Sequence, residues 1–455
     1  MASQSQANEG SDFGPELADW ISSNGGSVGN VEVVKELFGG WGLKATQECK
    51  KGTVLIDVPK KCQVTYDKSA DPKLLALIEQ VPEELWGGRL ALKLIGERAK
   101  GDESFFVPYL KSLPVGVPGL PMFYQGPILR ELQYPPLIEQ VKKRCRWLVD
   151  FGTKQLAPLK GTEQDPFGGV SVSVDGLGWG LGVVSSRAFR TRGPKEPAAM
   201  LPLIDMCNHS FEPNCEIVGS KEGTAMVAKI DIKAGESFFL NYGNLPNDFL
   251  LLDYGFVVPV NPYDTVQLRF DLNMIELGRD IGGLAKAKVG KGVGKDGSIE
   301  LHEWQKLALV ALGLAGPNAD LQVNIGGKST VDPRFLAALR ILFVDDRAKI
   351  RNVEMDSLGS WDTPIDPQNE VKALRTLAGI LASTSAQFPT KLEDDQVLMS
   401  GGEFGDPNTP LVLSFRIEKK VVLMQAIQFV GLKLKEIAEA GKASKSSQEN
   451  KKGFG

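Results

Sequence analysis

The spacing of hydrophobic residues changes three times along the chain. After a polar lead and a helical segment around Pro15–Ser22, short β-branched runs from 31 to 72 are separated by glycine and Lys-Gly, a pattern typical of small strands joined by tight turns. From 73 to 169, apolar residues recur every three or four positions, as in Ala91, Leu94 and Ile95, which predicts helices. A helical insertion therefore follows the first β-region.

The pattern of short strands returns from 170 to 270. A glycine-rich apolar segment there precedes four runs that we expect to be strands: MLPLIDM, CEIVG, TAMVAKI and ESFFLNYG. Beyond 271, apolar residues three or four apart predict a helical bundle. We expect the two β-regions to complete one another in space.

The predicted organisation is α+β. With 455 residues, the chain is long enough for two or three domains. The predicted parts are a polar lead with a first helix (1–30), a first β-region (31–72), a helical insertion (73–169), a second β-region that carries the candidate chemistry (170–270), an all-helical domain (271–440) and a flexible tail (441–455).

Composition and charge narrow the classes of function. Hydrophobic residues make up 42% and charged residues 24%, which is typical of a soluble globular protein. The 52 basic and 56 acidic residues give a net charge of −4, so no overall basic field points to nucleic acid as a partner. The sequence contains no run of 18 apolar residues, so no membrane span is predicted. The polar start resembles neither a signal peptide nor a complete transit peptide.

Cysteine and histidine usage argues against several chemistries. The five cysteines form no CxxC pair, so we expect free thiols in a reducing compartment. Cys207, His209 and Cys215 could supply only three zinc ligands, so a zinc site is a weak alternative. Because the chain has only two histidines and no GxSxG elbow, a Ser-His-Asp hydrolase is a weak alternative.

Polar and aromatic residues of chemical interest cluster in the second β-region, within 185–189, 203–210 and 238–256. Asp205, Asn208 and His209 follow the apolar run MLPLI, so we expect them where a buried strand ends. Buried polar groups need partners, and three together serve either a ligand or an internal hydrogen-bond network. On spacing alone the network is favoured.

The motifs FGGWGLKA (38–45), SRAF, DMCNHS and FLNYG followed by DYGF occur in this order, with the helical insertion between the first two. In this arrangement the chain resembles the SET-domain methyltransferases of the Rubisco large-subunit methyltransferase-like class, over about 30–440. The resemblance implies a SET β-fold interrupted by a helical insertion and followed by an all-helical domain that binds the protein substrate. It also implies S-adenosylmethionine as co-substrate and no metal, because the zinc-binding cysteine cluster of many histone-directed SET enzymes is missing.

The resemblance assigns roles to individual residues. The turn at Gly40 and Trp41 would lay its backbone along the cofactor, and Arg187, beside Ser186, would meet the methionyl carboxylate with a planar guanidinium. Tyr242 matches the catalytic tyrosine. The complete cofactor set implied is Gly40, Trp41, Ser186, Arg187, Asp205, Asn208, His209 and Tyr242.

Tyr254 and Phe256 match the channel that admits the target lysine. Without the resemblance, core packing of these aromatic residues would be favoured. One relative of this class methylates histidine and lacks the second tyrosine, so the presence of Tyr254 favours lysine as the acceptor.

The resemblance further implies a monomer that acts on a non-histone protein. Rubisco large subunit and fructose-bisphosphate aldolase are the substrates it suggests, in the chloroplast stroma, with the cytosol as the alternative compartment. The rival hypothesis is a SET-derived binding or regulatory protein that keeps the fold but transfers little or no methyl.

Overall fold

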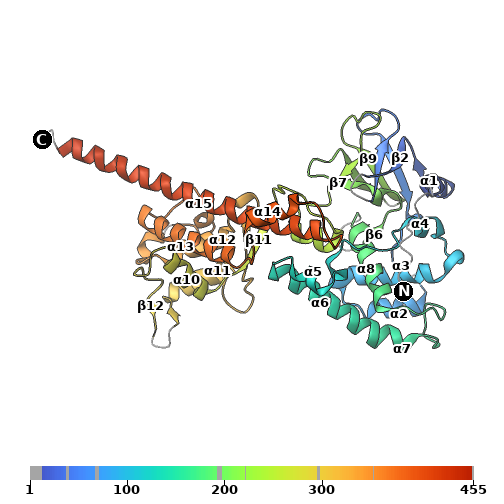
Figure 1. Ribbon diagram of the computed structural model, residues 1–455, viewed down its shortest axis with the longest axis horizontal. Coiled ribbons are helices and arrows are strands. Elements are labelled where there is room, and N and C mark those ends of the chain that lie inside the picture. The colour runs from blue at the N-terminus through green and yellow to red at the C-terminus, as the bar shows by residue number, and fades with distance from the viewer. Residues whose placement is uncertain are drawn as a thin grey trace. The chain divides into compact units, whose positions relative to one another are not determined.

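The computed structural model describes residues 13–36, 40–66, 71–191, 197–220, 222–294, 298–351 and 353–452. Two compact units divide the chain (Figure 1). The first unit comprises Met1–Gln125, Glu139–Leu245 and Phe249–Phe256, and the second comprises Gly126–Ile138, Pro246–Asp248 and Val257–Gly455. Residues 126–138, which the sequence places in the helical insertion, thus group with the second unit.

The main sheet of the first unit joins segments from the two β-regions. It has four strands in the order β1-β4-β9-β8, all antiparallel to their neighbours. Asp57 of β4 lies opposite Ala225 of β9, so the two β-regions do complete one another, as the sequence predicts. The strands are β1 (Ser27–Val28), β4 (Val54–Pro59), β8 (Cys215–Gly219) and β9 (Gly223–Ala228).

Three two-stranded pairs complete the β-structure of this unit. Two are antiparallel, β2 (Val31–Lys35) with β3 (Trp41–Ala45) and β5 (Ala188–Phe189) with β6 (Ala199–Met200). The third, β7 (Asn208–His209) with β10 (Phe239–Leu240), is parallel and sets Asn208 opposite Phe239. This parallel pair brings the DMCNHS and FLNYG motifs side by side.

The first half of the chain also forms helices, most of them in this unit. Asp71 caps α2 by accepting hydrogen bonds from the main chain of Lys73 and Leu74, and Pro72 fits the first helical position. The helices of the first half of the chain are α1 (Phe13–Ser23), α2 (Pro72–Glu79), α3 (Trp86–Ala99), α4 (Val107–Ser112), α5 (Gly126–Arg130), α6 (Pro135–Phe151) and α7 (Ala157–Leu159).

The glycine-rich segment that precedes the SRAF motif is a helix, α8 (Val174–Arg187). Ser173 caps it by accepting a hydrogen bond from the main chain of Gly176. Two of its glycines allow close packing, since a Cβ on Gly180 would lie 2.9 Å from Ile95 and one on Gly182 would lie 2.7 Å from Leu120. Packing against the insertion thus outweighs the low helix propensity of glycine.

The run MLPLIDM departs from the predicted strand. Only Ala199–Met200 is extended, and Ile204–Met206 forms a 3₁₀ turn. Pro202 has no main-chain donor for a strand ladder, and Leu203 has a φ of 71°, which reverses the chain direction. Asp205 therefore lies on a turn, and the expectation that it ends a buried strand is wrong.

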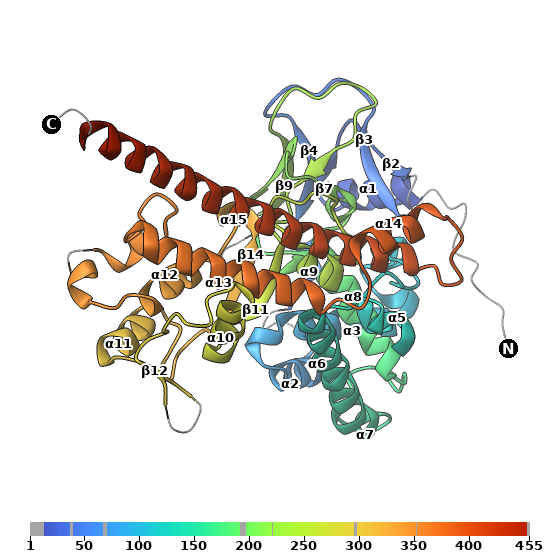
Figure 2. The ribbon, with the colours of Figure 1, turned by 60° about the vertical axis from the view of Figure 1, so that its left-hand side comes forward.

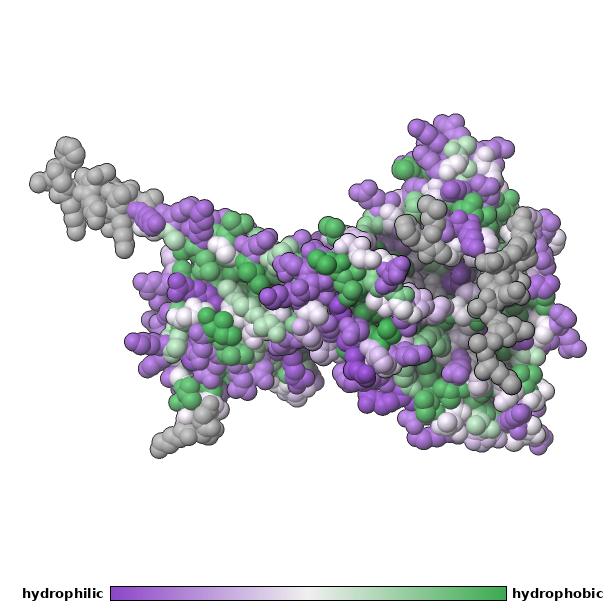
Figure 3. Space-filling view, viewed as in Figure 1, coloured by the Kyte–Doolittle hydropathy of each residue, from purple (hydrophilic) through white to green (hydrophobic). Residues whose placement is uncertain are grey.

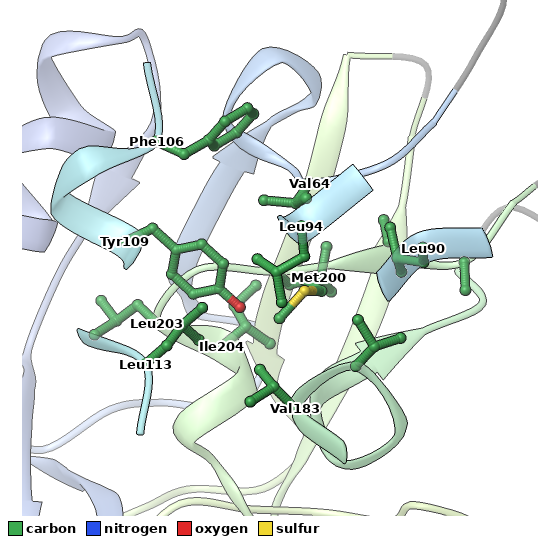
Figure 4. Close-up of a cluster of buried hydrophobic side chains, with 14 of the residues drawn as sticks. Val64, Leu90, Leu94, Phe106, Tyr109, Leu113, Val183, Met200, Leu203 and Ile204 are labelled. Atoms are coloured by element: carbon green, nitrogen blue, oxygen red, sulfur yellow. The ribbon is translucent and has the colours of Figure 1, made fainter. Parts of the chain in front are cut away.

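The core of the first unit joins the insertion to the strands. Figure 4 shows Tyr109 of α4 packed near Leu203 and Ile204, with Leu94 and Val183 on the neighbouring helices. All five side chains are buried. The insertion is therefore an integral part of this core.

The second unit is mainly helical, as expected. Its longer helices are α10 (Leu272–Ile281), α11 (Glu303–Ala311), α12 (Pro333–Leu342), α13 (Pro367–Ala386), α14 (Leu392–Ser400) and α15 (Thr409–Lys452), and α9 (Asn247–Phe249) is a single turn. α15 runs beside α13 (Figure 2). It continues to Lys452, so the segment from 441, predicted as a flexible tail, extends this helix.

The second unit also contains strands, which corrects the expectation of an all-helical domain. β11 (Thr265–Arg269) pairs with β14 (Gln322–Gly326), and β12 (Gly292–Val293) with β13 (Ile299–Glu300), both antiparallel. β11 falls at the end of the predicted second β-region, whereas β12, β13 and β14 lie within 271–440 and are too short to stand out between helical patterns. Among the described helices, none is long and apolar enough to cross a bilayer.

Candidate active site

The catalytic tyrosine predicted from the sequence, Tyr242, follows β10 and makes two hydrogen bonds in the first unit. Its main-chain N–H donates to Nδ1 of His209 (3.2 Å), and its hydroxyl donates to the main-chain oxygen of Cys207 (2.7 Å). Burial raises the pKa of Tyr242 far above its usual value, so the phenol stays protonated. The hydroxyl is thus a neutral donor held in one orientation.

Aromatic rings surround Tyr242. Tyr254 stacks on it, with ring centroids 4.9 Å apart and planes at 23°, and Phe256 lies 6.5 Å from Tyr242. His209 is 5.2 Å away on another side. We call Tyr242, Tyr254 and Phe256 the aromatic wall.

Tyr254 ends a π-helical turn, Leu250–Tyr254, and Gly255 follows with a φ of 77°. This left-handed conformation suits glycine and turns Phe256 back toward the tyrosines. Burial raises the pKa of Tyr254 to about 12, so its hydroxyl is also protonated at neutral pH.

A buried network links the helical insertion to the second β-region. The Tyr109 hydroxyl donates to Oδ2 of Asp205 (2.6 Å), and Nη1 of Arg187 lies 3.4 Å from the same oxygen. The other carboxylate oxygen, Oδ1, has no partner within the described part of the chain. Burial raises the pKa of Asp205, against the opposing effect of Arg187.

Tyr109 is a site residue that the sequence analysis missed. It lies in the segment FFVPYLKS of the insertion, where no motif marks it. A buried tyrosine needs a hydrogen-bond partner for its hydroxyl, but the sequence does not identify that partner as Asp205, 96 positions away.

The structure brings together the residues predicted to hold the cofactor. The Asn208 amide lies 3.4 Å from the main-chain oxygen of Trp41. Arg187 joins the same cluster through Asp205, and its charge acts on the pKa of Tyr242. Phe38 and Gly39 of the first motif lie outside the described residues.

These residues fit S-adenosylmethionine on several counts. Gly40 has a φ of 93°, and a Cβ on Gly42 would come within 2.5 Å of Oε1 of Glu36 and 3.0 Å of the Asn208 amide. Gly42 therefore has little room for a side chain, whereas at Gly40 it is the left-handed backbone conformation, and not the space around it, that favours glycine. Buried Nε2 of His209 is without a partner among the described residues, as is Oδ1 of Asp205. Such groups suit a polar ligand.

Ser186 differs from the other residues of this set. Its hydroxyl donates back to the main-chain oxygens of Gly182 and Val183 within α8. The hydroxyl hydrogen is therefore engaged with its own helix, and toward a ligand the side chain can act only as an acceptor.

The pH dependence of stability provides a test of the His209 environment. Burial lowers the pKa of His209, so the folded chain binds this proton less readily than the unfolded chain, whose histidines titrate near about 6.5. The resulting stabilisation is complete above that pH and is lost as the pH falls through it. We expect the unfolding free energy of wild type to drop more than that of His209→Asn between about pH 7.5 and 5.5, with His302→Gln as the control. Equal drops in urea titrations would contradict this environment.

Two protein-family models match parts of the chain. The "SET domain" family model matches residues 40–243, and the "Rubisco LSMT substrate-binding" model matches residues 296–423. Among curated proteins, the chain is 24% identical over 446 residues to the actin-histidine N-methyltransferases of Gallus gallus and Homo sapiens, covering 92% of this chain and 68% of each relative.

Solved structures share the fold. The SET domain of LSMT bound to MeLysine and AdoHcy gives a TM-score of 0.68 at 20% identity, and Rubisco LSMT bound to AdoMet gives 0.65 at 19%, each over 94% of both chains. The chain therefore contains a SET domain. Because a Rubisco LSMT substrate-binding domain follows it, the chain belongs to the Rubisco LSMT-like SET methyltransferases. Methyl transfer to a protein, with S-adenosylmethionine as co-substrate, is the activity supported for it.

Proposed function

We propose that the chain is a protein-lysine N-methyltransferase that acts on a non-histone protein. One observation carries the choice of acceptor: two protonated phenols, Tyr242 and Tyr254, stack at 4.9 Å and stand beside Phe256. The aromatic wall is apolar on its faces and presents hydroxyls at its edges. Such a surface suits a slender alkylamine, and the resemblance also associates a second tyrosine with lysine.

S-adenosylmethionine, when bound, supplies a methyl group on a positively charged sulfur. Arg187 would meet its carboxylate, since a guanidinium suits a planar anion. Asn208 and the Trp41 main chain would hold its polar ends, and the glycine turn at Gly40 would let the backbone approach closely. The network of Tyr109, Asp205 and Arg187 fixes the guanidinium before any ligand arrives.

The aromatic wall would also help a lysine lose its proton. A lysine with a pKa near 10.4 must expose its lone pair, which costs about 4 to 5 kcal/mol at pH 7 at about 1.36 kcal/mol per pKa unit. An apolar surround lowers the pKa of an amine because it penalises the charged form. The Asp205 carboxylate would oppose this effect if it faced the amine, but the Arg187 guanidinium beside its Oδ2 offsets its charge.

Tyr242 would align the acceptor with the methyl donor. Its hydroxyl is held by the Cys207 main-chain oxygen, so the ring cannot swing away. Oxygens at such a site accept weak hydrogen bonds from a polarised methyl group. Alignment of nucleophile and electrophile supplies much of the acceleration in a displacement of this kind.

Histidine is the second candidate acceptor, and the names of the curated relatives favour it. Those proteins are actin-histidine N-methyltransferases. A free imidazole titrates near about 6.5, so its neutral form needs no deprotonation at pH 7. On this alternative the aromatic wall would serve to pack a flat ring.

A single labelling experiment tests the proposal. The protein is incubated with tritiated S-adenosylmethionine and a soluble protein extract, and the labelled protein is hydrolysed and chromatographed. We expect the tritium in methylated lysine. Recovery in methylhistidine would transfer the function to the second candidate, and binding of the cofactor by calorimetry without any transfer would favour the SET-derived binding protein.

The substrate and compartment stay predictions of the resemblance. Rubisco large subunit, aldolase and the chloroplast stroma follow from it, as does a monomer. Fractionation of cells, followed by mass spectrometry of methylated proteins with and without this chain, would test all but the oligomeric state.

A further inference from the structure

The second unit contains an apolar pocket of about 570 Å³. Its walls come from β11, α10, the end of α13, and the first turn of α6 with the two residues before it, all within this unit. The apolar side chains that line it include Val266, Leu268, Met274, Leu277, Ile380 and Phe388. We call it the β11 pocket. On the face of the molecule shown in Figure 3, hydrophobic and hydrophilic residues are interspersed.

An open strand edge borders the β11 pocket. β11 pairs with β14 on one side only. On its outer side, the Gln267 main-chain N–H donates to the Tyr134 hydroxyl (2.7 Å), and the Thr265 main-chain oxygen accepts from Nζ of Lys419 (2.8 Å). In an antiparallel strand, the N–H and C=O of one residue point to the same side, and this side alternates from residue to residue. The main-chain groups of Arg269, two residues after Gln267, therefore also point to the outer side.

Part of this outer edge carries main-chain groups that are not hydrogen-bonded. Within the described ranges, the main-chain oxygen of Gln267 and both main-chain groups of Arg269 have no hydrogen-bond partner. Unpaired groups of this kind are a template for another extended segment. A strand laid along the edge would satisfy them, whereas a compact apolar molecule in the pocket would not.

The charge at the pocket is a single guanidinium. Arg269 is exposed, and it forms no ion pair with any described residue. None of the residues that line the pocket is an aspartate or glutamate. The pocket therefore complements an acidic group that accompanies an apolar side chain.

We propose that an extended segment of the protein substrate binds by strand addition to the outer edge of β11. It places a large apolar side chain in the β11 pocket and an acidic side chain on Arg269. The inference rests on the proposed function for the identity of the partner. The match of residues 296–423 to a substrate-binding domain, which includes the α13 wall, agrees with it. Main-chain hydrogen bonds supply affinity in this mode, and side-chain pockets supply selectivity.

The test uses an array of fluorescent peptides of about six residues, the usual length of a strand. Every peptide is threonine at most positions. One acidic residue and two apolar residues are placed at positions that differ from peptide to peptide. Binding is measured without S-adenosylmethionine, so the result does not depend on methyl transfer. We expect wild type to bind best those peptides in which an acidic residue accompanies a large apolar one. N-methylation of the peptide amides that face β11 should abolish this binding, whereas N-methylation of the alternate amides should not.

Three variants make the test specific. Arg269→Glu should weaken the selected peptides by about tenfold or more, as should Leu277→Asp, which is expected to keep the fold because Leu277 is 51% exposed. Arg375→Glu makes the same charge change at an exposed position outside the pocket and should bind as wild type does.

Several outcomes would overturn the proposal. The first is an array in which no peptide binds. The second is equal binding of the peptides by wild type, Arg269→Glu and Leu277→Asp. The third is an equal loss of binding from N-methylation of the facing amides and of the alternate amides. Failure of the proposed function is distinguishable, since the peptides would then bind in the expected manner while the labelling experiment gave no methylated residue.

Discussion

Tyr242→Phe is expected to lower kcat for protein methylation by about 100-fold or more, while S-adenosylmethionine still binds. The substitution removes only the hydroxyl, which is held in place by the Cys207 main-chain oxygen at 2.7 Å. Loss of one preoriented polar group at a reacting centre has effects of this size. Initial rates of tritium transfer give kcat, and calorimetry gives the affinity for the cofactor.

Tyr124→Phe is the matched control. Its hydroxyl also donates to a main-chain oxygen of the first unit, that of Gly119 at 2.9 Å, but it lies outside the aromatic wall. Both variants leave a carbonyl short of a partner, so each should lose about 1 to 3 kcal/mol of stability. Only Tyr242→Phe should lose turnover, and equal rates in the two variants would remove Tyr242 from its catalytic role.

Arg340→Met is expected to destabilise the second unit by about 3 to 5 kcal/mol. Arg340 of α12 is fully buried, and it donates to both carboxylate oxygens of Glu370, each at 2.7 Å. Its Nη1 also donates to the main-chain oxygens of Leu358 and Ser360. The substitution leaves a buried carboxylate and two carbonyls without these partners. Urea denaturation of the variant measures the loss.

The double variant Arg340→Met/Glu370→Leu provides the check on this explanation. With both charges removed, most of the lost stability should return, because an apolar pair of similar volume can replace a buried ion pair. Arg334→Met, whose side chain is 33% exposed, should cost about 1 kcal/mol or less. A double variant no more stable than Arg340→Met would contradict the assignment of the loss to an unpaired Glu370.

The sequence predicts the arrangement of the first unit well because its signals are local. Short β-branched runs bounded by glycine are recognisable one by one, and the two β-regions meet across the insertion as expected, through β4 and β9. Helical spacing likewise predicts α12 and α13. The aromatic wall follows from two motifs that lie close together in the sequence, with Tyr254 and Phe256 placed 12 and 14 positions after Tyr242.

What the sequence did not predict depends on contacts between distant segments. Tyr109 reaches Asp205 only because α4 packs against the turn after Leu203, itself in an unusual backbone conformation. The helix α8 forms despite its glycines because neighbouring side chains fill the space beside them. The strands β11 and β14 are separated by 52 residues, and neither shows a pattern long enough to predict the pairing.

The central claim is that segments far apart in the sequence form one S-adenosylmethionine site in the first unit. Hydrogen–deuterium exchange with and without the cofactor tests it most directly. The account predicts slower exchange on binding in the segments 40–45, 186–190, 205–210 and 240–243, and unchanged exchange in β11 and α13. Slowing confined to the second unit, or no slowing in those four segments under conditions where calorimetry detects binding, would contradict it.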